Sequence, residues 1–455
     1  MKKNKEKRIF LSGTGLITPY GEGLGKVFDG ISQGQLCYGP LKEVPCETWP
    51  VRVGGWIPDI GADKLGLINN KLKNMPKYVR LGVLAAKSAF LNAGIKDNEI
   101  PPERLGAFIS TGNHGRNAEG LFPAFEASIG EDKQLDLTKL GSEGIDKVHP
   151  WWLLTTISNN LIFFITHFMK AKGANSNYCN SAIAGAYAFD KALESLAIDE
   201  VDVALVGGSD SPLNWQMISD FSVLDFLAQG DLDSILPNSK ILNEESKAVG
   251  STNLTNPANL ANPANTASKC PKPLYNQGAI FSDGACFAVL ETEEHLMKRG
   301  VQPLCEIKAI ALSRQSTDLF APAPDGSESL EILQALTKNL TTNSRIHINT
   351  SSVGLPNWDK PEQFSIEMFS KEYNISVSGL KTWLGHTYSA SFVLETAILA
   401  EALKRKVFPG FSRLKNPLEI IHWTNPIQGT FEHNYAINLG QCFGGNSAGI
   451  LLHAV

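Results

Sequence analysis

The chain has 455 residues, of which 43% are hydrophobic and 19% are charged, as is ordinary for a globular protein with a sizeable core. This length fits two or three ordinary domains, or one large duplicated architecture. The formal net charge of −5 argues against a nucleic-acid-binding domain, because no basic field would attract phosphates.

Cysteine usage and hydropathy indicate the compartment. The seven cysteines are scattered, with no CxxC pair and no metal-ligand spacing, which favours a reducing cytoplasm over a disulfide framework. The basic start, MKKNKEKRIFLSGTG, has too short an apolar run for a signal peptide. Polar residues interrupt the most apolar segment, 151–169, so we interpret it as a buried helix and not as a membrane span. We expect a cytoplasmic protein with no membrane contact.

Short apolar runs alternate with helical patterns along the chain. The first half predicts a strand with a Gly-rich turn at 8–19, a helix at 78–95, a strand at 104–112, a helix at 184–197 and a strand at 201–209. The pattern resumes at 279–291, 303–313, 328–340, 346–352, 391–406 and 435–445. Strands interleaved with helices predict an α/β protein with mostly parallel sheets. We expect two similar halves, 1–270 and 271–455.

A stretch rich in asparagine, proline and alanine lies before the expected boundary. Residues 253–269 read NLTNPANLANPANTASK, with NPAN twice. This composition is typical of an irregular surface loop. We interpret it as a tolerated insertion in preference to a functional segment.

Four motifs follow one another in the order found in one enzyme family. They are IFLSGTGLITPYGEG, KPLYNQGAIFSDGACFAVLE, GLKTWLGHTYSAS and CFGGNSAGILL. They look like the opening strand, the segment that enters the second half, the lysine-x-x-x-glycine-histidine turn and the terminal glycine-rich turn of the β-ketoacyl synthases. The chain therefore resembles these condensing enzymes of fatty-acid and polyketide synthesis almost end to end. The resemblance implies a thiolase-like fold, with two similar βαβ halves in α-β-α-β-α layers.

The resemblance also implies a chemistry. An acyl chain passes from a carrier-protein thioester to a cysteine at a strand-to-helix elbow, where the helix N-terminus stabilises the thiolate. Two histidines promote decarboxylation of a malonyl-type extender. Backbone N–H groups of the cysteine and of the terminal turn, here Phe443, Gly444 and Gly445, hold the acyl oxyanion. No cofactor is expected beyond the phosphopantetheine arm of the acyl carrier protein.

The position of the nucleophile can be counted from both sides. Family members place the cysteine nine residues after a turn glycine, here Gly173, and 25 residues before the first glycine of a strand end, here Gly207. Both counts arrive at Ala182. Cys179 lies three residues upstream, on the strand that leads to the elbow, so its side chain points to the opposite face. We interpret Cys179 as a buried structural residue.

Other catalytic positions have changed as well. Ser351 falls where the family has its first histidine, and His347 is four residues earlier on the same strand, too far to replace it. His386 matches the second histidine and Lys381 the family lysine. The acidic and arginine-containing pattern of active members reads PLYNQG at 273–278. We expect no condensation at this site and a structural role for His386 and Lys381 in holding their turn.

Within the family, the resemblance is to the chain length factor, the inactive ketosynthase β subunit of type II polyketide synthases that make aromatic polyketides and aryl polyenes. Such a subunit pairs with an active ketosynthase and forms part of the acyl-chain tunnel. Leu121, Phe122 and Phe125 fall where family members line that tunnel. The aromatic residues of 151–169, including Phe163 and Phe164, are candidates for the apolar interface.

Three alternatives stay open. An active β-ketoacyl synthase would use Cys179 with His386 as its base, and a decarboxylase of malonyl-carrier thioesters would use Lys381 and His386 without a thiol. The third is a scaffold with no tunnel role. The cationic run at 71–80, with Lys71, Lys73, Lys77 and Arg80, is a weak candidate for docking an acidic acyl carrier protein.

Overall fold

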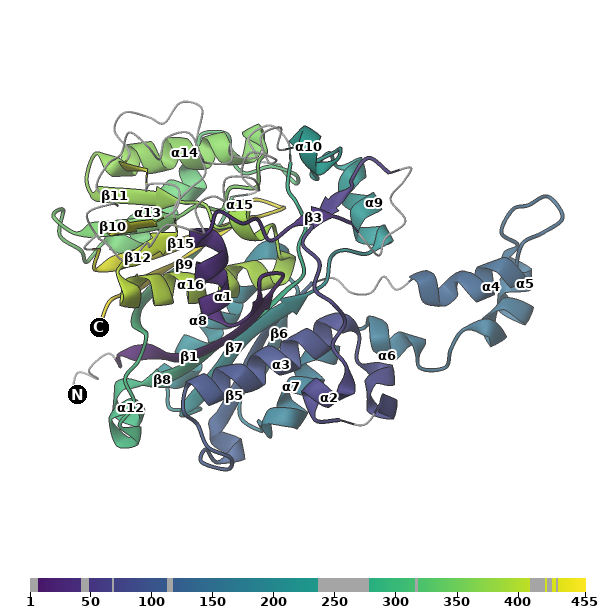
Figure 1. Ribbon diagram of the computed structural model, residues 1–455, viewed down its shortest axis with the longest axis horizontal. Coiled ribbons are helices and arrows are strands. Elements are labelled where there is room, and N and C mark those ends of the chain that lie inside the picture. Colours follow the sequence, from purple (N-terminus) through teal and green to yellow (C-terminus); the bar gives the residue numbers. More distant parts are fainter. Residues whose placement is uncertain are drawn as a thin grey trace, which may run out of the picture.

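The computed structural model describes residues 7–41, 49–67, 69–112, 118–235, 278–315, 318–409, 422–423, 428–430 and 433–455. The expected boundary near residue 270, the loop 253–269 and most of 273–278 lie outside these ranges. Figure 1 shows the two halves side by side, with the segment 118–157 extending from one of them.

Most strands of the described residues form one large mixed sheet, and β3–β4 and β12–β14 form two separate two-stranded ones. The order of the large sheet is β13–β11–β10–β15–β16–β9–β1–β8–β7–β5–β6, with β2 (Gly21–Glu22) added to the end of β1. The first-half strands are β1 (Ile9–Thr18), β5 (Leu105–Thr111), β6 (Asn175–Tyr178), β7 (Val203–Asp210) and β8 (Gly284–Thr292). The second-half strands are β9 (Cys305–Arg314), β10 (Arg345–Asn349), β11 (Asn374–Ser378), β13 (His422–Trp423), β15 (Tyr435–Cys442) and β16 (Asn446–His453).

The strand directions correct the expectation of mostly parallel sheets. Each half has a parallel part, β6–β5–β7 in the first and β15–β10–β11–β13 in the second. In contrast, β1, β8, β9 and β16 pair antiparallel with their neighbours. Alternation of strand and helix in the sequence predicts only the strands that are joined by parallel crossovers. The central strands are antiparallel, and the short β1–β9 ladder joins the two halves.

The first-half and second-half parts of the large sheet are the two β layers, and helices form the three layers outside and between them (Figure 1). In the first half, α3 (Lys77–Asn92) and α7 (Asn160–Met169) cover the outer face of the sheet, and α8 (Ala184–Ala197) covers its inner face. In the second half, α13 (Ser327–Thr337) and α14 (Pro356–Ser370) lie outside and α16 (Ser391–Arg405) lies inside. Because α8 and α16 also contact each other, the predicted α-β-α-β-α layering is confirmed.

Shorter elements complete the chain. They are α1 (Leu24–Ser32), β3 (Gly39–Pro40), β4 (Val53–Gly54), α2 (Ala62–Leu65), α9 (Trp215–Val223), α10 (Leu232–Ile235), α12 (Glu293–Arg299), α15 (Lys381–Leu384), β12 (Val407–Pro409) and β14 (Gln428–Thr430).

Residues 13–15 are strand, so the predicted Gly-rich turn is wrong. The whole of 9–18 is the buried strand β1. A Cβ on Gly13 would collide with the backbone of Ala93, and one on Gly15 with the backbone of Ala85. The two glycines therefore allow α3 to pack closely on the strand.

The segment 151–169 is also different from the prediction. It consists of two helices, α6 (Trp152–Thr156) and α7, and much of its apolar surface is exposed: Trp151 is 56% and Phe163 is 61% exposed. Of its large apolar side chains, Leu161 and Ile165 are the fully buried ones. No helix among the described residues is both long and apolar enough to cross a membrane.

Residues 118–157 form the arm seen in Figure 1. Its helices are η3 (Ala118–Leu121), α4 (Phe122–Ala127), α5 (Leu137–Lys139), η4 (Leu140–Gly144), η5 (Ile145–Lys147) and α6. They pack mainly on one another. The arm leaves many large apolar side chains exposed: Phe122, Ile129, Leu135, Leu137, Ile145, Trp151, Leu153, Leu154 and Ile157.

Candidate functional site

The counted position 182 falls in the elbow between β6 and α8. The chain passes from β6 through Asn180 into the short helix η6 (Ser181–Ile183), which leads directly into α8. Ser181 has a φ of +49°, a conformation that a non-glycine residue adopts only where the surroundings enforce it. Ala182, the next residue, is buried and brings only a methyl group to this position.

Cys179 is exposed, so the prediction of a buried cysteine is wrong. It follows β6, which lies at the edge of the sheet and pairs with β5 alone among the described strands. The Cys179 sulfur lies 3.3 Å from the Thr111 hydroxyl and 3.5 Å from the Asn177 amide. The thiol is therefore outside the elbow, at an open edge.

The thiol that lies at the elbow is that of Cys442, which no sequence motif singles out. Cys442 ends β15, is 5% exposed, and its sulfur lies 3.6 Å from the carbonyl oxygen of Asn180. Burial raises the pKa of the Cys442 thiol, while the Ser181 hydroxyl and the backbone N–H groups of Ala182, Phe443 and Ile183 act to lower it. The Cys442 side chain therefore lies at the start of the turn that carries Ala182.

The terminal glycine-rich turn connects β15 to β16 as expected. Gly444 and Gly445 have φ values of +76° and +63°, which glycine adopts without strain. The Gly444 N–H donates to the Leu319 carbonyl over 2.9 Å. The Phe443 ring stands 5.3 Å from that of Phe226 and 5.1 Å from that of Trp358, so the turn is covered by aromatic side chains.

His386 borders the same aromatic cluster: the centroid of its ring lies 6.1 Å from that of Phe226. Its Nδ1 accepts a hydrogen bond of 3.0 Å from the Tyr388 backbone N–H, so the proton of the neutral ring is on Nε2. Burial, and secondarily the charge of Lys381, lower the pKa of His386 to about 3. The ring is therefore a neutral hydrogen-bond donor at physiological pH.

Lys381, the first residue of α15, is held by an ion pair. Its Nζ lies 2.8 Å from Oε1 and 3.1 Å from Oε2 of Glu395 on α16, and both side chains are buried. Asn349, at the end of β10, donates to the same carboxylate over 3.0 Å and accepts from the Leu380 N–H over 2.9 Å. Lys381 thus connects β10, α15 and α16, which supports the structural role expected for it.

Ser351 lies two residues beyond β10, and its hydroxyl donates to Oε1 of Gln441 over 3.1 Å. Its N–H donates to both carboxylate oxygens of Glu362, at 2.9 and 3.1 Å, and Asp359 accepts the N–H groups of Val353 and Gly354 at 2.9 Å each. Burial raises the pKa of both carboxyl groups to about 7. The two acids were missed in the sequence because they follow the turn on α14 and show no motif of their own.

His347 is in the core, away from these groups. Its ring nitrogens lie 2.8 Å from the hydroxyls of Ser376 and Ser378, and its ring stacks on Phe408 at 4.1 Å. Burial lowers the pKa of His347 well below its usual value. The imidazole is engaged in packing, in agreement with the prediction that it does not replace a histidine at position 351.

Comparison with known sequences decides the family. The model of the β-ketoacyl synthase N-terminal domain matches residues 6–236, and that of the C-terminal domain matches residues 304–415. The chain belongs to the β-ketoacyl synthase family.

Its curated relatives in this family are distant and align over nearly the whole chain. The 3-oxoacyl-[acyl-carrier-protein] synthase 2 of Synechocystis sp. is 23% identical over 91% of this chain and 89% of its own length. The tetracenomycin polyketide synthase ketoacyl synthase alpha subunit of Streptomyces glaucescens is 21% identical over 92% and 89%, respectively.

Solved structures show the same fold. A β-ketoacyl synthase from Burkholderia phymatum superimposes with a TM-score of 0.78 at 18% identity. The ishigamide ketosynthase/chain length factor gives 0.76 at 18%, and a type II polyketide ketosynthase in complex with its acyl carrier protein gives 0.75 at 19%. Each comparison covers 99% of this chain and all of the other chain.

The residues expected at a tunnel or interface lie apart from the elbow. Phe122 packs on Trp215 of α9 at 5.7 Å, and Trp215 in turn packs on the cluster that contains Phe226 and Trp358. Leu121 and Phe125 lie beside it on the arm and are half-buried. Phe164 packs on the outer-layer core of the first half, and Phe163 points to solvent. The arm residues therefore adjoin the aromatic cluster of Phe226 and Trp358, whereas the α7 residues lie on the outer surface.

The cationic run at 71–80 offers fewer free charges than its sequence indicates. Lys77 pairs with the buried Asp283 at 2.7 Å and stacks over Trp56, and Arg80 pairs with Asp59 at 2.6 Å. The side chain of Lys71 lies outside the described residues, and Lys73 is exposed. The interpretation of this run as a docking site is thus weakened.

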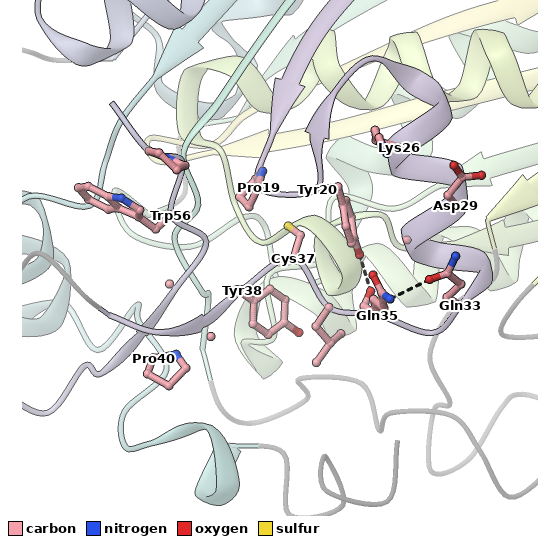
Figure 2. Close-up of a pocket in the computed structure, with 15 residues that line it drawn as sticks. Pro19, Tyr20, Lys26, Asp29, Gln33, Gln35, Cys37, Tyr38, Pro40 and Trp56 are labelled. Atoms are coloured by element: carbon pink, nitrogen blue, oxygen red, sulfur yellow. Dashed lines mark hydrogen bonds between the residues drawn. The ribbon is translucent and has the colours of Figure 1, made fainter. Parts of the chain in front are cut away.

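A separate cavity of about 600 Å³ lies behind the turn that carries Lys381 and His386. Figure 2 shows its polar wall, where Tyr20 donates to the Gln35 carbonyl over 2.6 Å. Cys37 and Tyr38 donate to carbonyls of α15, those of Leu384 and Thr382, at 2.9 Å each. The cavity is lined in part by α1 and contains none of the residues matched to the catalytic positions.

Proposed function

We propose that this chain is a catalytically degenerate ketosynthase-like subunit, a chain length factor, of a type II polyketide synthase that makes an aromatic polyketide or an aryl polyene. The observation that carries the proposal is Ala182 at the elbow: the turn is retained, but a methyl group can neither attack a thioester nor carry an acyl chain. Cys179 supplies no substitute, because it lies at the open sheet edge.

The losses around the elbow agree with this assignment. The position matched to the first histidine carries Ser351, whose hydroxyl and N–H are both engaged by buried partners. His386 keeps a donor at Nε2, but Phe226, Phe281 and Tyr388 surround its ring at 6.1 to 6.3 Å. The alternatives of an active synthase and of a malonyl decarboxylase therefore have less support than the subunit.

The proposed partner is an intact ketosynthase homologue. Among the described strands β6 pairs with β5 alone, so a second chain can extend the sheet at its other edge. The arm adds exposed apolar side chains in a number that isolated soluble chains rarely show. Asn177 of β6 donates to the Ser158 carbonyl at the base of the arm over 3.3 Å, so edge and arm are neighbouring parts of one surface.

Phe122, with Leu121 and Phe125, forms the tunnel wall in this proposal. The contact between Phe122 and Trp215 links the arm to the aromatic cluster beside His386. The substrate would arrive on the phosphopantetheine arm of an acyl carrier protein, as it does for relatives of this family. In the reconstituted pair, Phe122→Ala would lengthen the product if this wall limits the chain.

Co-expression tests the proposal. The chain is expressed with the intact Cys-His-His ketosynthase from its own gene neighbourhood, purified through a tag on one subunit, and incubated with an acyl-loaded carrier protein. We expect a 1:1 complex in which intact mass finds the acyl adduct on the partner alone. Separate migration of the two chains, an adduct on Cys179, or release of CO2 from a malonyl-loaded carrier by this chain alone would each contradict the proposal.

A further inference from the structure

The proposed function gives no role to the cavity of about 600 Å³ behind the turn that carries Lys381 and His386. This volume is in the range of sites that bind small molecules. Its walls come from three segments of the first half, residues 19–20, 26–40 and 54–58. The cavity is therefore a candidate ligand site separate from the elbow.

The two ends of the cavity differ in chemistry. Figure 2 shows Trp56 at one end and the charged residues Lys26 and Asp29 at the other. The ring of Tyr20 lies between them and packs on Gly30 of α1, where a Cβ would come within 2.5 Å of the ring. The cavity thus combines an aromatic wall with one group of each charge.

The two charged side chains are close together and have no partners. Lys26 and Asp29 are three residues apart on α1, so they lie on the same side of the helix. Both are exposed, and neither side chain forms an ion pair or a hydrogen bond with any residue that the structure describes. Next to them, the amide of Gln35 donates to that of Gln33 over 2.8 Å. This end of the cavity therefore offers an ammonium and a carboxylate that are both available to a ligand.

A ligand that meets both charges must carry an ammonium and a carboxylate close together on an apolar body. The ammonium would pair with Asp29 and the carboxylate with Lys26. The apolar part would lie along the rings of Tyr20 and Trp56. We propose that the cavity is a second ligand site of this chain, and that it binds a small zwitterion of the amino-acid type with an aromatic side chain. The inference does not depend on the proposed function, because none of these residues is matched to a catalytic position.

The wall of the cavity also holds α15. Carbonyl groups at a helix C-terminus have no partner within the helix, and here the cavity wall supplies the donors. The Tyr38 hydroxyl donates to the Thr382 carbonyl over 2.9 Å. Cys37 donates twice, from its thiol to the Leu384 carbonyl over 2.9 Å and from its N–H to the Trp383 carbonyl over 3.1 Å. A ligand bound to this wall should therefore slow local opening of α15.

The test compares three probes that differ in charge: L-tryptophan, tryptamine, which lacks the carboxylate, and indole-3-propionate, which lacks the ammonium. Calorimetric titration of the full-length chain gives the Kd of each. Because an exposed ion pair contributes little, L-tryptophan should bind only about three- to fivefold more tightly than either analogue at low salt. Asp29→Asn should abolish its advantage over indole-3-propionate, and Lys26→Met its advantage over tryptamine. The control Asp97→Asn, at an exposed position outside the cavity, should preserve both.

Hydrogen exchange shows where the probe binds. With L-tryptophan at ten times its Kd, exchange of the 381–385 amides through local opening should slow by about tenfold. Three results would each overturn the inference: equal Kd values for the three probes, no binding of L-tryptophan up to its solubility limit, or binding that leaves this exchange unchanged.

Discussion

The chamber around Ala182, Cys442 and His386 and the arm at 118–157 differ in what they do with apolar and reactive groups. In the chamber, the Cys442 thiol, the Lys381 ammonium and the Nδ1 atom of His386 each have a protein partner, and aromatic rings cover the terminal turn. The arm instead directs Trp151, Leu153 and their apolar neighbours into solvent. The polar groups of the first region have partners among the described residues, whereas the arm carries apolar side chains that no other described part of the chain covers.

The contrast between chamber and arm indicates how the ketosynthase fold can be kept without a nucleophile. The chamber keeps the strained backbone of a reactive site, with positive φ at Ser181 and Tyr388, although residue 182 carries no reactive group. The turn at η6 can persist because β15, α8 and α16 all contact it. In the proposed function, the apolar arm supplies the binding energy of an assembly, so the interaction surface is retained while the chemistry is lost.

Breaking the Lys381–Glu395 pair is expected to have the largest effect on the chamber. In Lys381→Met, the Glu395 carboxylate remains buried without its cation, which costs about 3–5 kcal/mol of unfolding free energy. Urea unfolding measures the loss. The control Lys73→Met, at an exposed position, should change stability by less than about 0.5 kcal/mol. A Lys381→Met variant as stable as this control would mean that the pair does not hold the turn.

Glu362 should make the free energy of unfolding depend on pH. Its pKa is raised to about 7, so the folded state favours the neutral carboxyl; the stabilisation is complete below the unfolded pKa, near 4.5, and is lost as the pH rises through 7. Glu362→Gln cannot ionise. Between pH 5 and pH 7 the unchanged protein should lose on the order of 2 kcal/mol relative to this variant, as followed by urea midpoints. Parallel curves for the two proteins would show that Glu362 is ionised throughout.

The arm is tested by charges placed on its exposed apolar side chains. Trp151→Glu/Leu153→Glu should weaken the complex with the partner ketosynthase by about 30-fold or more, because buried aromatic residues dominate interface energies. The control Leu91→Glu changes an apolar residue on α3 that is more exposed than either of these two. Titration by light scattering or calorimetry compares them, and isolated chains should unfold alike. If both variants bind the partner as the unchanged chain does, the arm is not the interface.

Sequence periodicity predicted the regular elements well. The helix predicted at 184–197 has these bounds in α8, and the helix at 78–95 and the strand at 201–209 differ from α3 and β7 by at most three residues at either end. Periodicity failed where a long-range contact sets the conformation. The glycines of β1 resemble a turn in sequence, and only the approach of α3 explains them as strand.

The candidate site shows the same limit. Counting residues located Ala182 at the elbow, because spacing along one strand and helix is local information. Cys442 approaches from 262 residues away, so no local pattern could place its sulfur there. The exposure of Cys179 could have been predicted from the sequence. The strand before it, Asn175–Tyr178, is polar, which is typical of an edge strand and not of a buried one.

Cys179 allows the test with the smallest expected effect, because its thiol lies at the β6 edge next to the arm. It is exposed, whereas Cys37, Cys286, Cys305 and Cys442 are buried, so iodoacetamide should modify Cys179 well before these four. Cys179→Ser should change the unfolding free energy by less than about 0.5 kcal/mol, since a surface side chain is lost. If the partner ketosynthase covers the β6 edge, complex formation should slow labelling of Cys179 at least about tenfold. Labelling at the same rate in the free and bound chain would place the interface elsewhere and separate the arm from the edge strand.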